Sequence, residues 1–167
     1  MRVLGIDCGT EYTGYGIVEQ AKDGVLQYVS AGVIRLNTRR PLHTRLFEIL
    51  QSLSELISEY RPACVAIEDL FYAVNVKSAL KLGHVRGVAM LAAAMAGLDV
   101  AEYAPLAVKS AVVGYGRAEK SQVQQMVARL LRINSVPQPA DAADALAIAI
   151  CHLHTSATIA RQAAAAP

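Results

Sequence analysis

Four acidic residues stand in apolar stretches of the chain, where an ionised carboxylate normally needs a partner. Asp7 and Glu68 each end a short apolar run, and Asp141 and Asp144 lie three residues apart in a segment of Ala, Leu and Ile. Carboxylates without Cys or His at metal-binding spacing suit Mg²⁺, with Mn²⁺ as a substitute. Two such ions about 3.5–4 Å apart can activate a water and stabilise the leaving oxygen of a phosphodiester. These residues therefore predict a metal-dependent phosphoryl-transfer site.

Three of these acids also have a simpler interpretation. Asp7 could cap the turn that follows it, Glu68 could be a surface acid at a strand end, and Asp141 could complement a helix dipole. Asp144 is harder to explain in this way, because a second carboxylate on a buried helix face is costly unless cations neutralise it. The three-residue spacing places Asp141 and Asp144 on the same face of the helix.

Apolar periodicity predicts the elements that must position these acids. We expect strands over residues 3–6, 13–18, 25–36, 63–67 and 100–103, and helices over 41–60, 75–96, 105–114, 119–133 and from 140. The helix between the first and fourth strands implies a crossover, so these strands are expected to be parallel neighbours. Ligands bind at the carboxyl ends of such strands, where Asp7 and Glu68 stand. Gly14 and Gly16 in the second strand suggest close backbone approach nearby.

The chain has 167 residues, of which 54% are hydrophobic, and is long enough for one domain with a substantial core. We place this domain at residues 1–156 and expect residues 157–167 to form a flexible C-terminal tail. Cys8, Cys64 and Cys151 are too far apart for a zinc motif and indicate a reduced, cytoplasmic protein. No signal peptide precedes the first strand, and the uncharged apolar run before residue 99 is too short to span a bilayer.

Positive charge is concentrated in one part of the chain, although the net charge is only +2. Residues 71–140 contain eight Lys or Arg and three Asp or Glu, which suits a polyanionic partner; solvated helix faces are the alternative. Phe71 could stack on a nucleic-acid base or anchor the core. Lys120 stands in the first turn of a helix, where a cation opposes the helix dipole. A residue placed unfavourably for helix stability indicates a functional role.

A stripe of small residues marks the helix expected at residues 75–96. Ala79, Gly83 and Gly87 recur every four residues along it. Glycine lowers helix stability, so two glycines in one helix need a packing reason. The stripe could let another helix approach closely, either within the fold or across a dimer.

Several stretches of the chain resemble, in order, the RuvC family of crossover junction endonucleases, which resolve Holliday junctions. They are residues 4–7 with 13–16, 66–68 with 71, 78–83 with 86–87, 108–109 with 112–114, 118–123 and 140–145. The resemblance implies an RNase H-like α/β fold, with a mixed five-stranded sheet and helices on both faces. It also implies a homodimer that nicks a four-way DNA junction symmetrically, leaves 5′-phosphate and 3′-hydroxyl ends, and works with the branch-migration motor of RuvA and RuvB.

The same resemblance assigns roles to individual residues. The ligands of two Mg²⁺ ions would be Asp7, Glu68, Asp141 and Asp144. Lys109 and Lys120 match family lysines that support DNA binding or the transition state, and Phe71 matches a side chain that stacks on unpaired bases. With the basic residues near them, the expected DNA contacts are Phe71, Tyr72, Lys77, Lys81, Arg86, Lys109, Arg117 and Lys120. The expected dimer contacts are Ala79, Gly83 and Gly87.

One position departs from the family pattern, because Cys8 stands where Pro is usual. We expect activity to persist and the thiol to bring sensitivity to oxidation. Two other interpretations compete with a nuclease. The motif Gly-Ile-Asp-Cys-Gly-Thr also resembles the phosphate loop of sugar kinases and actin-like ATPases, but those need a second, similar domain for which this chain is too short. A junction-binding module without catalysis is the other alternative.

Overall fold

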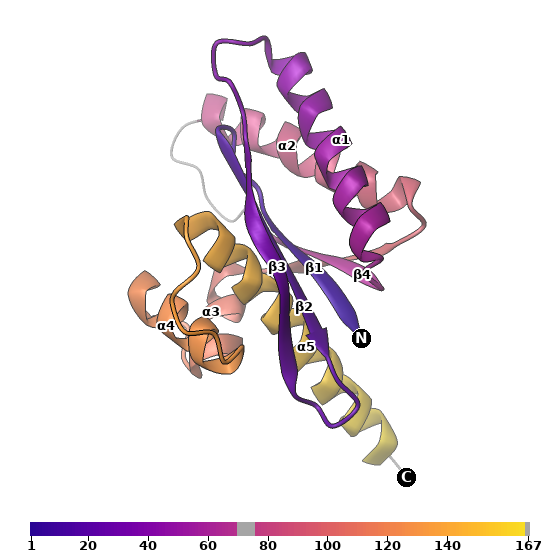
Figure 1. Cartoon of the computed structure of the whole chain (residues 1–167), viewed down its shortest axis with the longest axis vertical. Helices are drawn as coiled ribbons and strands as arrows, with labels where there is room; N and C mark the ends of the chain where they lie inside the picture. The colour runs from indigo at the N-terminus through magenta and orange to yellow at the C-terminus, as the bar shows by residue number, and fades with distance from the viewer. Residues whose placement is uncertain (70–75, 166–167) are drawn as a thin grey trace.

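A five-stranded sheet forms the centre of the computed structural model, which describes residues 1–69 and 76–165 (Figure 1). The strands are β1 (Arg2–Asp7), β2 (Tyr12–Gln20), β3 (Leu26–Arg35), β4 (Cys64–Glu68) and β5 (Asp99–Tyr103), in the order β3-β2-β1-β4-β5. β2 pairs antiparallel with both β1 and β3, whereas β1, β4 and β5 run parallel. The predicted parallel pairing of the first and fourth strands is therefore confirmed, and their carboxyl ends lie at one edge of the sheet.

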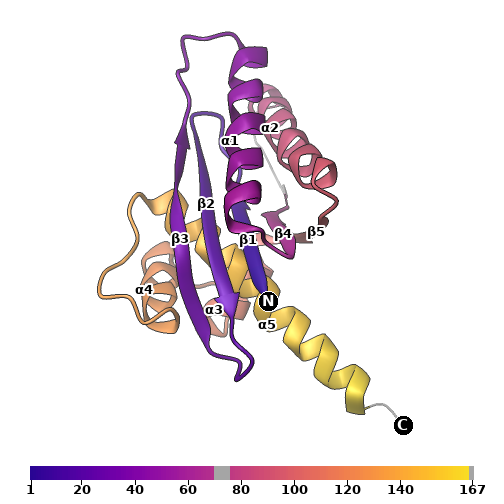
Figure 2. The same cartoon turned by 45° about the vertical axis from the view of Figure 1, so that its right-hand side comes forward.

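Helices pack on both faces of this sheet. α1 (Leu42–Tyr60) and α2 (Val76–Met95) lie on one face, and α3 (Pro105–Val113), α4 (Lys120–Leu130) and α5 (Ala140–Ala165) lie on the other (Figures 1 and 2). Alternation along β1 divides the two cores, because Leu4 and Ile6 pack toward α1 and α2 while Val3 packs toward α5. The predicted mixed sheet with helices on both faces is confirmed.

Glycines in the two central strands let α5 lie unusually close to the sheet. A Cβ atom built on Gly14 would stand 2.1 Å from the backbone oxygen of Asp141, and one on Gly5 would stand 2.1 Å from that of Ala145. Since real Cβ atoms do not approach so closely, a side chain at either position would push the helix away. The close approach that the sequence suggested for Gly14 thus involves the helix that carries two of the predicted acids.

Two helix ends differ from the sequence-based expectation. α4 ends at Leu130 rather than at residue 133, and Arg132 adopts a left-handed backbone conformation with φ 53° just beyond it. α5 continues to Ala165, so most of the segment expected to be a flexible tail is helical. Alanine has the highest intrinsic helix propensity, and the alanines in this segment explain the extension. The domain boundary at residue 156 stays a prediction.

The end of α5 projects beyond the sheet, whereas its earlier turns are part of the core (Figure 2). By length and composition alone, Ala140–Ile159 could cross a membrane, and 56% of the tested window is buried inside the protein. Buried core helices of globular proteins commonly have this composition. We therefore interpret α5 as the central helix of the fold.

Replacing Gly14 by Ala tests the contact between α5 and the sheet. We expect Gly14→Ala to destabilise the fold by about 1–3 kcal/mol, because the added methyl group overlaps the backbone of Asp141. Chemical denaturation followed by circular dichroism measures this change. Gln27→Ala, at an exposed position on β3, is the control. Equal stability of both variants would contradict the close contact.

Candidate active site

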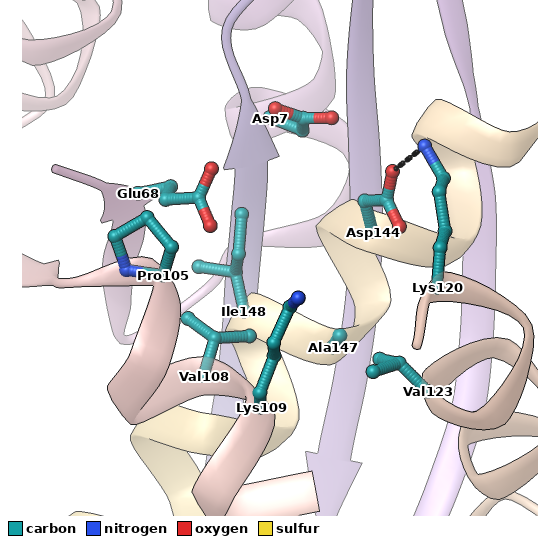
Figure 3. A pocket seen from close by; sticks show the side chains of 10 residues that line it. All are labelled: Asp7, Glu68, Pro105, Val108, Lys109, Lys120, Val123, Asp144, Ala147 and Ile148. Atoms are coloured by element: carbon teal, nitrogen blue, oxygen red, sulfur yellow. Dashed lines mark ion pairs between the residues drawn. The ribbon is translucent and has the colours of Figure 1, made fainter. Parts of the chain in front are cut away.

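A pocket of about 200 Å³ opens at the carboxyl ends of β1 and β4, between the sheet and the helices α3, α4 and α5 (Figure 3). Its lining residues are Asp7, Glu68, Pro105, Val108, Lys109, Lys120, Val123, Asp144, Ala147 and Ile148. Charged side chains from five elements point toward one space, and apolar side chains form the rest of the wall. Three of the four predicted acids therefore line one pocket together with both predicted lysines.

Asp7 and Glu68 reach the pocket because they end neighbouring parallel strands, in which Ile6 pairs with Ile67. Burial raises the pKa of Asp7 from 3.8 to about 7, and the charges of Asp144, Glu68 and Asp141 add to this rise. Burial, followed by the charge of Asp144, also raises the pKa of Glu68. The carboxylates are thus close enough to repel one another.

Asp144 reaches the pocket from the second turn of α5, and Lys120 compensates part of its charge. Lys120 Nζ lies 2.6 Å from Asp144 Oδ2, and this hydrogen bond is the main cause of the raised pKa of Lys120 (Figure 3). Asp141 lies one turn earlier and is not among the lining residues, but its charge contributes to the raised pKa of Asp7. Three of the four predicted acids therefore line the pocket, and Asp141 lies near enough for its charge to affect Asp7.

Lys109 lies in the middle of α3, and Lys120 is the first residue of α4. Residues close to each lysine in the sequence determine where its helix begins. Glu119 and Gln122 form a reciprocal capping box that begins α4 directly before Lys120. Pro105 begins α3, and Lys109 follows one turn later. Lys109 and Lys120 both lower the pKa of Glu68 by their charge, so both face the carboxylates.

Two polar contacts that sequence reasoning missed hold the turn after Asp7. The fully buried Thr13 donates its hydroxyl hydrogen bond to the carbonyl oxygen of Gly9, at 3.0 Å. Arg45 Nη1, on α1, donates to the carbonyl oxygen of Thr10, at 2.9 Å. The sequence showed Arg45 in a basic segment but gave no signal for its partner, which is 35 residues away.

Cys8 follows Asp7 in this turn, where its surroundings keep the thiol protonated. Burial, together with the negative charge of Asp7, raises the pKa of Cys8 from 9.0 to about 12. The thiolate is the form that reacts with oxidants. The raised pKa lowers the fraction of reactive thiolate, and the expected sensitivity of Cys8 to oxidation stays a prediction.

The pocket fits a hard divalent cation by its donor chemistry, because all four acids offer oxygen and repel one another. The side chains do not form a closed cage. Among the residues that the structure describes, no three Asp, Glu, His or Cys side chains stand close enough together to hold one metal ion. Asp144 is instead paired with Lys120. Binding a cation would require these carboxylates to turn toward a common point.

The other predicted contacts lie outside this pocket. Lys81 is exposed on α2, Arg117 is exposed in the segment between α3 and α4, and Lys77 lies in the first turn of α2. Arg86 lies on α2, and its side chain is only 16% exposed. Among the described residues, nothing beyond their own turns of α2 lies within 4 Å of where a Cβ atom of Gly83 or Gly87 would stand. Phe71 and Tyr72 lie outside the described residues, and their predicted roles stay predictions.

Comparison with known proteins places the chain in a family. The family model described as "Crossover junction endodeoxyribonuclease RuvC" matches residues 3–152. A relative of that name from Koribacter versatilis is 66% identical over 166 residues, which are 99% of this chain and 100% of the relative. A second, from Acidobacterium capsulatum, is 56% identical over 97% of this chain and 98% of its own length. The chain belongs to the RuvC family.

Solved RuvC structures have the same fold. The Thermus thermophilus RuvC structure has a TM-score of 0.88 and 33% identity, and covers 95% of this chain and 96% of its own. T. thermophilus RuvC in complex with a Holliday junction substrate has a TM-score of 0.87 and 30% identity, with the same coverage. The yeast mitochondrial Holliday junction resolvase Ydc2, at 16% identity and a TM-score of 0.72, shares the fold alone. RuvC membership confirms the RNase H-like fold and leaves the kinase-like interpretation without support.

Removing one carboxylate from this RuvC pocket tests the repulsion within it. With chelator present, we expect wild-type stability to fall as the pH rises from 5 to 8. The folded state keeps a proton on Asp7, whose pKa is about 7, whereas the unfolded state has released it near the usual 3.8. Asp7→Asn should therefore melt several degrees higher than wild type at pH 8, and the gain should be smaller at pH 5.

Thermal melts of Asp7→Asn and wild type at both pH values measure this difference. Glu59→Gln, which removes an exposed acid from α1, is the matched control and should leave the pH dependence unchanged. A gain for Asp7→Asn that is equal at pH 5 and pH 8 would show that the Asp7 carboxylate is not held in the protonated form.

Proposed function

We propose that the protein resolves four-way DNA junctions by hydrolysing one phosphodiester bond in each of two opposing strands. The chain is an endodeoxyribonuclease of the RuvC family and, as such, uses a divalent metal ion. The observation that carries the proposal is the meeting of Asp7, Glu68 and Asp144 with two lysines in one pocket. A relative of the same fold, T. thermophilus RuvC, has been captured with a Holliday junction substrate.

Asp7, Glu68, Asp141 and Asp144 would hold two Mg²⁺ ions, for which Mn²⁺ would substitute. When bound, the ions supply charge neutralisation and an activated water for in-line attack on phosphorus. Attack releases the 3′-oxygen, so the products are a 5′-phosphate and a 3′-hydroxyl.

The chain itself contributes two cationic side chains and an apolar wall to the pocket. Lys109 and Lys120 present ammonium groups beside the carboxylates, where they can bind the phosphate oxygens whose negative charge grows during attack. Val108, Val123 and Ile148 line the same space with apolar side chains, which lower the local dielectric constant and strengthen each charged contact. Lys120 is also the ion-pair partner of Asp144, at 2.6 Å.

A homodimer would bring two such pockets to one junction. The outward face of α2 combines the open Gly83 and Gly87 with exposed apolar side chains: Leu80 is 60% exposed, Leu91 is 50% and Met95 is 68%. Exposed apolar side chains on one helix face commonly mark a protein contact. The RuvA–RuvB motor and a cytoplasmic location are further parts of the proposal and come from the resemblance to the family.

Asp144→Asn tests the catalytic assignment. We expect wild type to make paired nicks in opposing strands of a synthetic mobile junction with Mg²⁺, and none with chelator. Asp144→Asn should lose about a hundredfold or more in nicking rate, because several kcal/mol of charge stabilisation disappear. It should still bind the junction with chelator present. Glu59→Gln is the control, and full cleavage by Asp144→Asn would remove this residue from the ligand set.

Leu91→Lys tests the proposed dimer. A charge on the outward face of α2 should dissociate the dimer, which sedimentation velocity measures directly. Cleavage should then give single, unpaired nicks. Leu106→Lys is the control, because Leu106 is also exposed, at 64%, but lies on α3. A Leu91→Lys protein that sediments as wild-type dimer would place the interface elsewhere.

A further inference from the structure

Arg86 makes a set of contacts that the sequence did not predict. It lies on α2, and its guanidinium forms ion pairs with Asp69, at 3.3 Å, and with Glu102. Its Nε also donates a hydrogen bond of 3.4 Å to the backbone carbonyl oxygen of Glu68. The side chain is 16% exposed, so these contacts lie largely inside the protein.

These contacts meet at the carboxyl ends of β4 and β5, directly behind the pocket. Glu68 pairs with Tyr103 at the end of the two strands, and the amide of Asp69 donates to the carbonyl oxygen of Tyr103, at 2.8 Å. The carboxylate of Glu68 points to the pocket beside α3 and α5, whereas Arg86 approaches from the α2 side of the sheet. Arg86 therefore touches the backbone that aims the Glu68 side chain.

The charge of Arg86 is already shared within this cluster. Asp69 and Glu102 together carry two formal negative charges against the single positive charge of Arg86. A phosphate would have to displace a carboxylate from a guanidinium whose planar fork suits that carboxylate well. Lys81, by contrast, is exposed on the same helix. The cluster therefore favours a structural use of Arg86 over a contact with DNA.

We propose that Arg86 is a positioning residue for the nuclease reaction: it fixes Glu68 through the Glu68 carbonyl, Asp69 and Glu102, and does not bind DNA phosphate. This inference rests on the proposed junction-resolving function. Because α2 also carries the proposed dimer face, Arg86 connects that helix to the strand end that holds Glu68. A displacement of α2 would act on the backbone of Glu68 through this side chain as well as through the packing of α2 on β4.

The first test compares Arg86→Met with wild type. At saturating junction and Mg²⁺, Arg86→Met should nick about tenfold to a hundredfold more slowly, the range that a small misplacement of a reacting group produces. Junction affinity with chelator should stay within about twofold, and the slope of affinity against salt should be unchanged. Lys81→Met is the contrasting variant: it should bind more weakly, with a slope smaller by about one. Lys22→Met, at an exposed turn, is the neutral control.

A second measurement requires neither DNA nor metal. In free protein, the Asp69 amide should exchange its hydrogen faster in Arg86→Met than in wild type. The reason is that Arg86 no longer anchors the end of β4, so the hydrogen bond from this amide to Tyr103 opens more often. Arg86→Lys keeps the charge but lacks the fork, and should fall between the two in both exchange and nicking. Unchanged exchange at Asp69 in Arg86→Met would overturn the positioning role.

Glu102→Gln separates the two possible roles of Arg86 and keeps the test valid if Arg86→Met does not fold. A positioning network predicts slower nicking by Glu102→Gln, and no further loss when it is combined with Arg86→Met. An arginine that binds phosphate would instead be released by Glu102→Gln and would bind the junction more tightly, which would overturn the inference. Weaker binding by Arg86→Met with a smaller salt slope and normal nicking at saturation would do the same. A wild-type protein that nicks no junction would refute the proposed function, while faster Asp69 exchange would still support the Arg86 anchor.

Discussion

The close packing of α5 on the glycines of β1 and β2 is the constraint on which the site depends. The backbone of α5 touches Gly5 and Gly14 at distances that leave no room for a Cβ atom. This contact lets α5 pack close to the sheet, so that Asp144 and Asp7 line the same pocket. Side chains at these two positions would push the helix outward and hold its carboxylates farther from the strand ends. The missing side chains of two glycines thus determine whether acids from distant parts of the chain can meet at one pocket.

This arrangement concentrates negative charge at a cost in stability. Asp7 is buried among other acids, and its pKa of about 7 reflects that unfavourable position. Lys120 offsets part of the repulsion through its ion pair with Asp144, although it starts a helix where a cation is locally unfavourable. Local and long-range preferences conflict at this residue, and conflicts of this kind are common at functional sites.

The sequence predicted most of the elements, because they depend on local apolar patterns and on punctuation such as Pro105 and Gly114. It also predicted Asp7, Glu68 and Asp144, since each breaks an apolar pattern that packing alone would favour. The partners of Arg45 and Arg86 could not be predicted in this way. The partner of Arg45 is 35 residues away, and the ion-pair partners of Arg86 are 16 and 17 residues away. A sequence does not show whether an arginine contacts a carboxylate, a carbonyl oxygen or solvent. The helical end of α5 was missed because its alanines fit both a tail and a helix.

The mixture of charges in the pocket has a consequence for how DNA approaches it. Four acids and two lysines leave a formal excess of two negative charges around the space that a phosphate must enter. Apart from the two pocket lysines and the paired Arg86 and Glu102, the segment 71–140 still contains five Lys or Arg and two Asp or Glu, so it can attract a polyanion that the pocket itself repels. The charge of the segment therefore favours DNA binding, whereas the charge of the pocket opposes the entry of a phosphate. Cations must neutralise the carboxylates before a phosphate can enter.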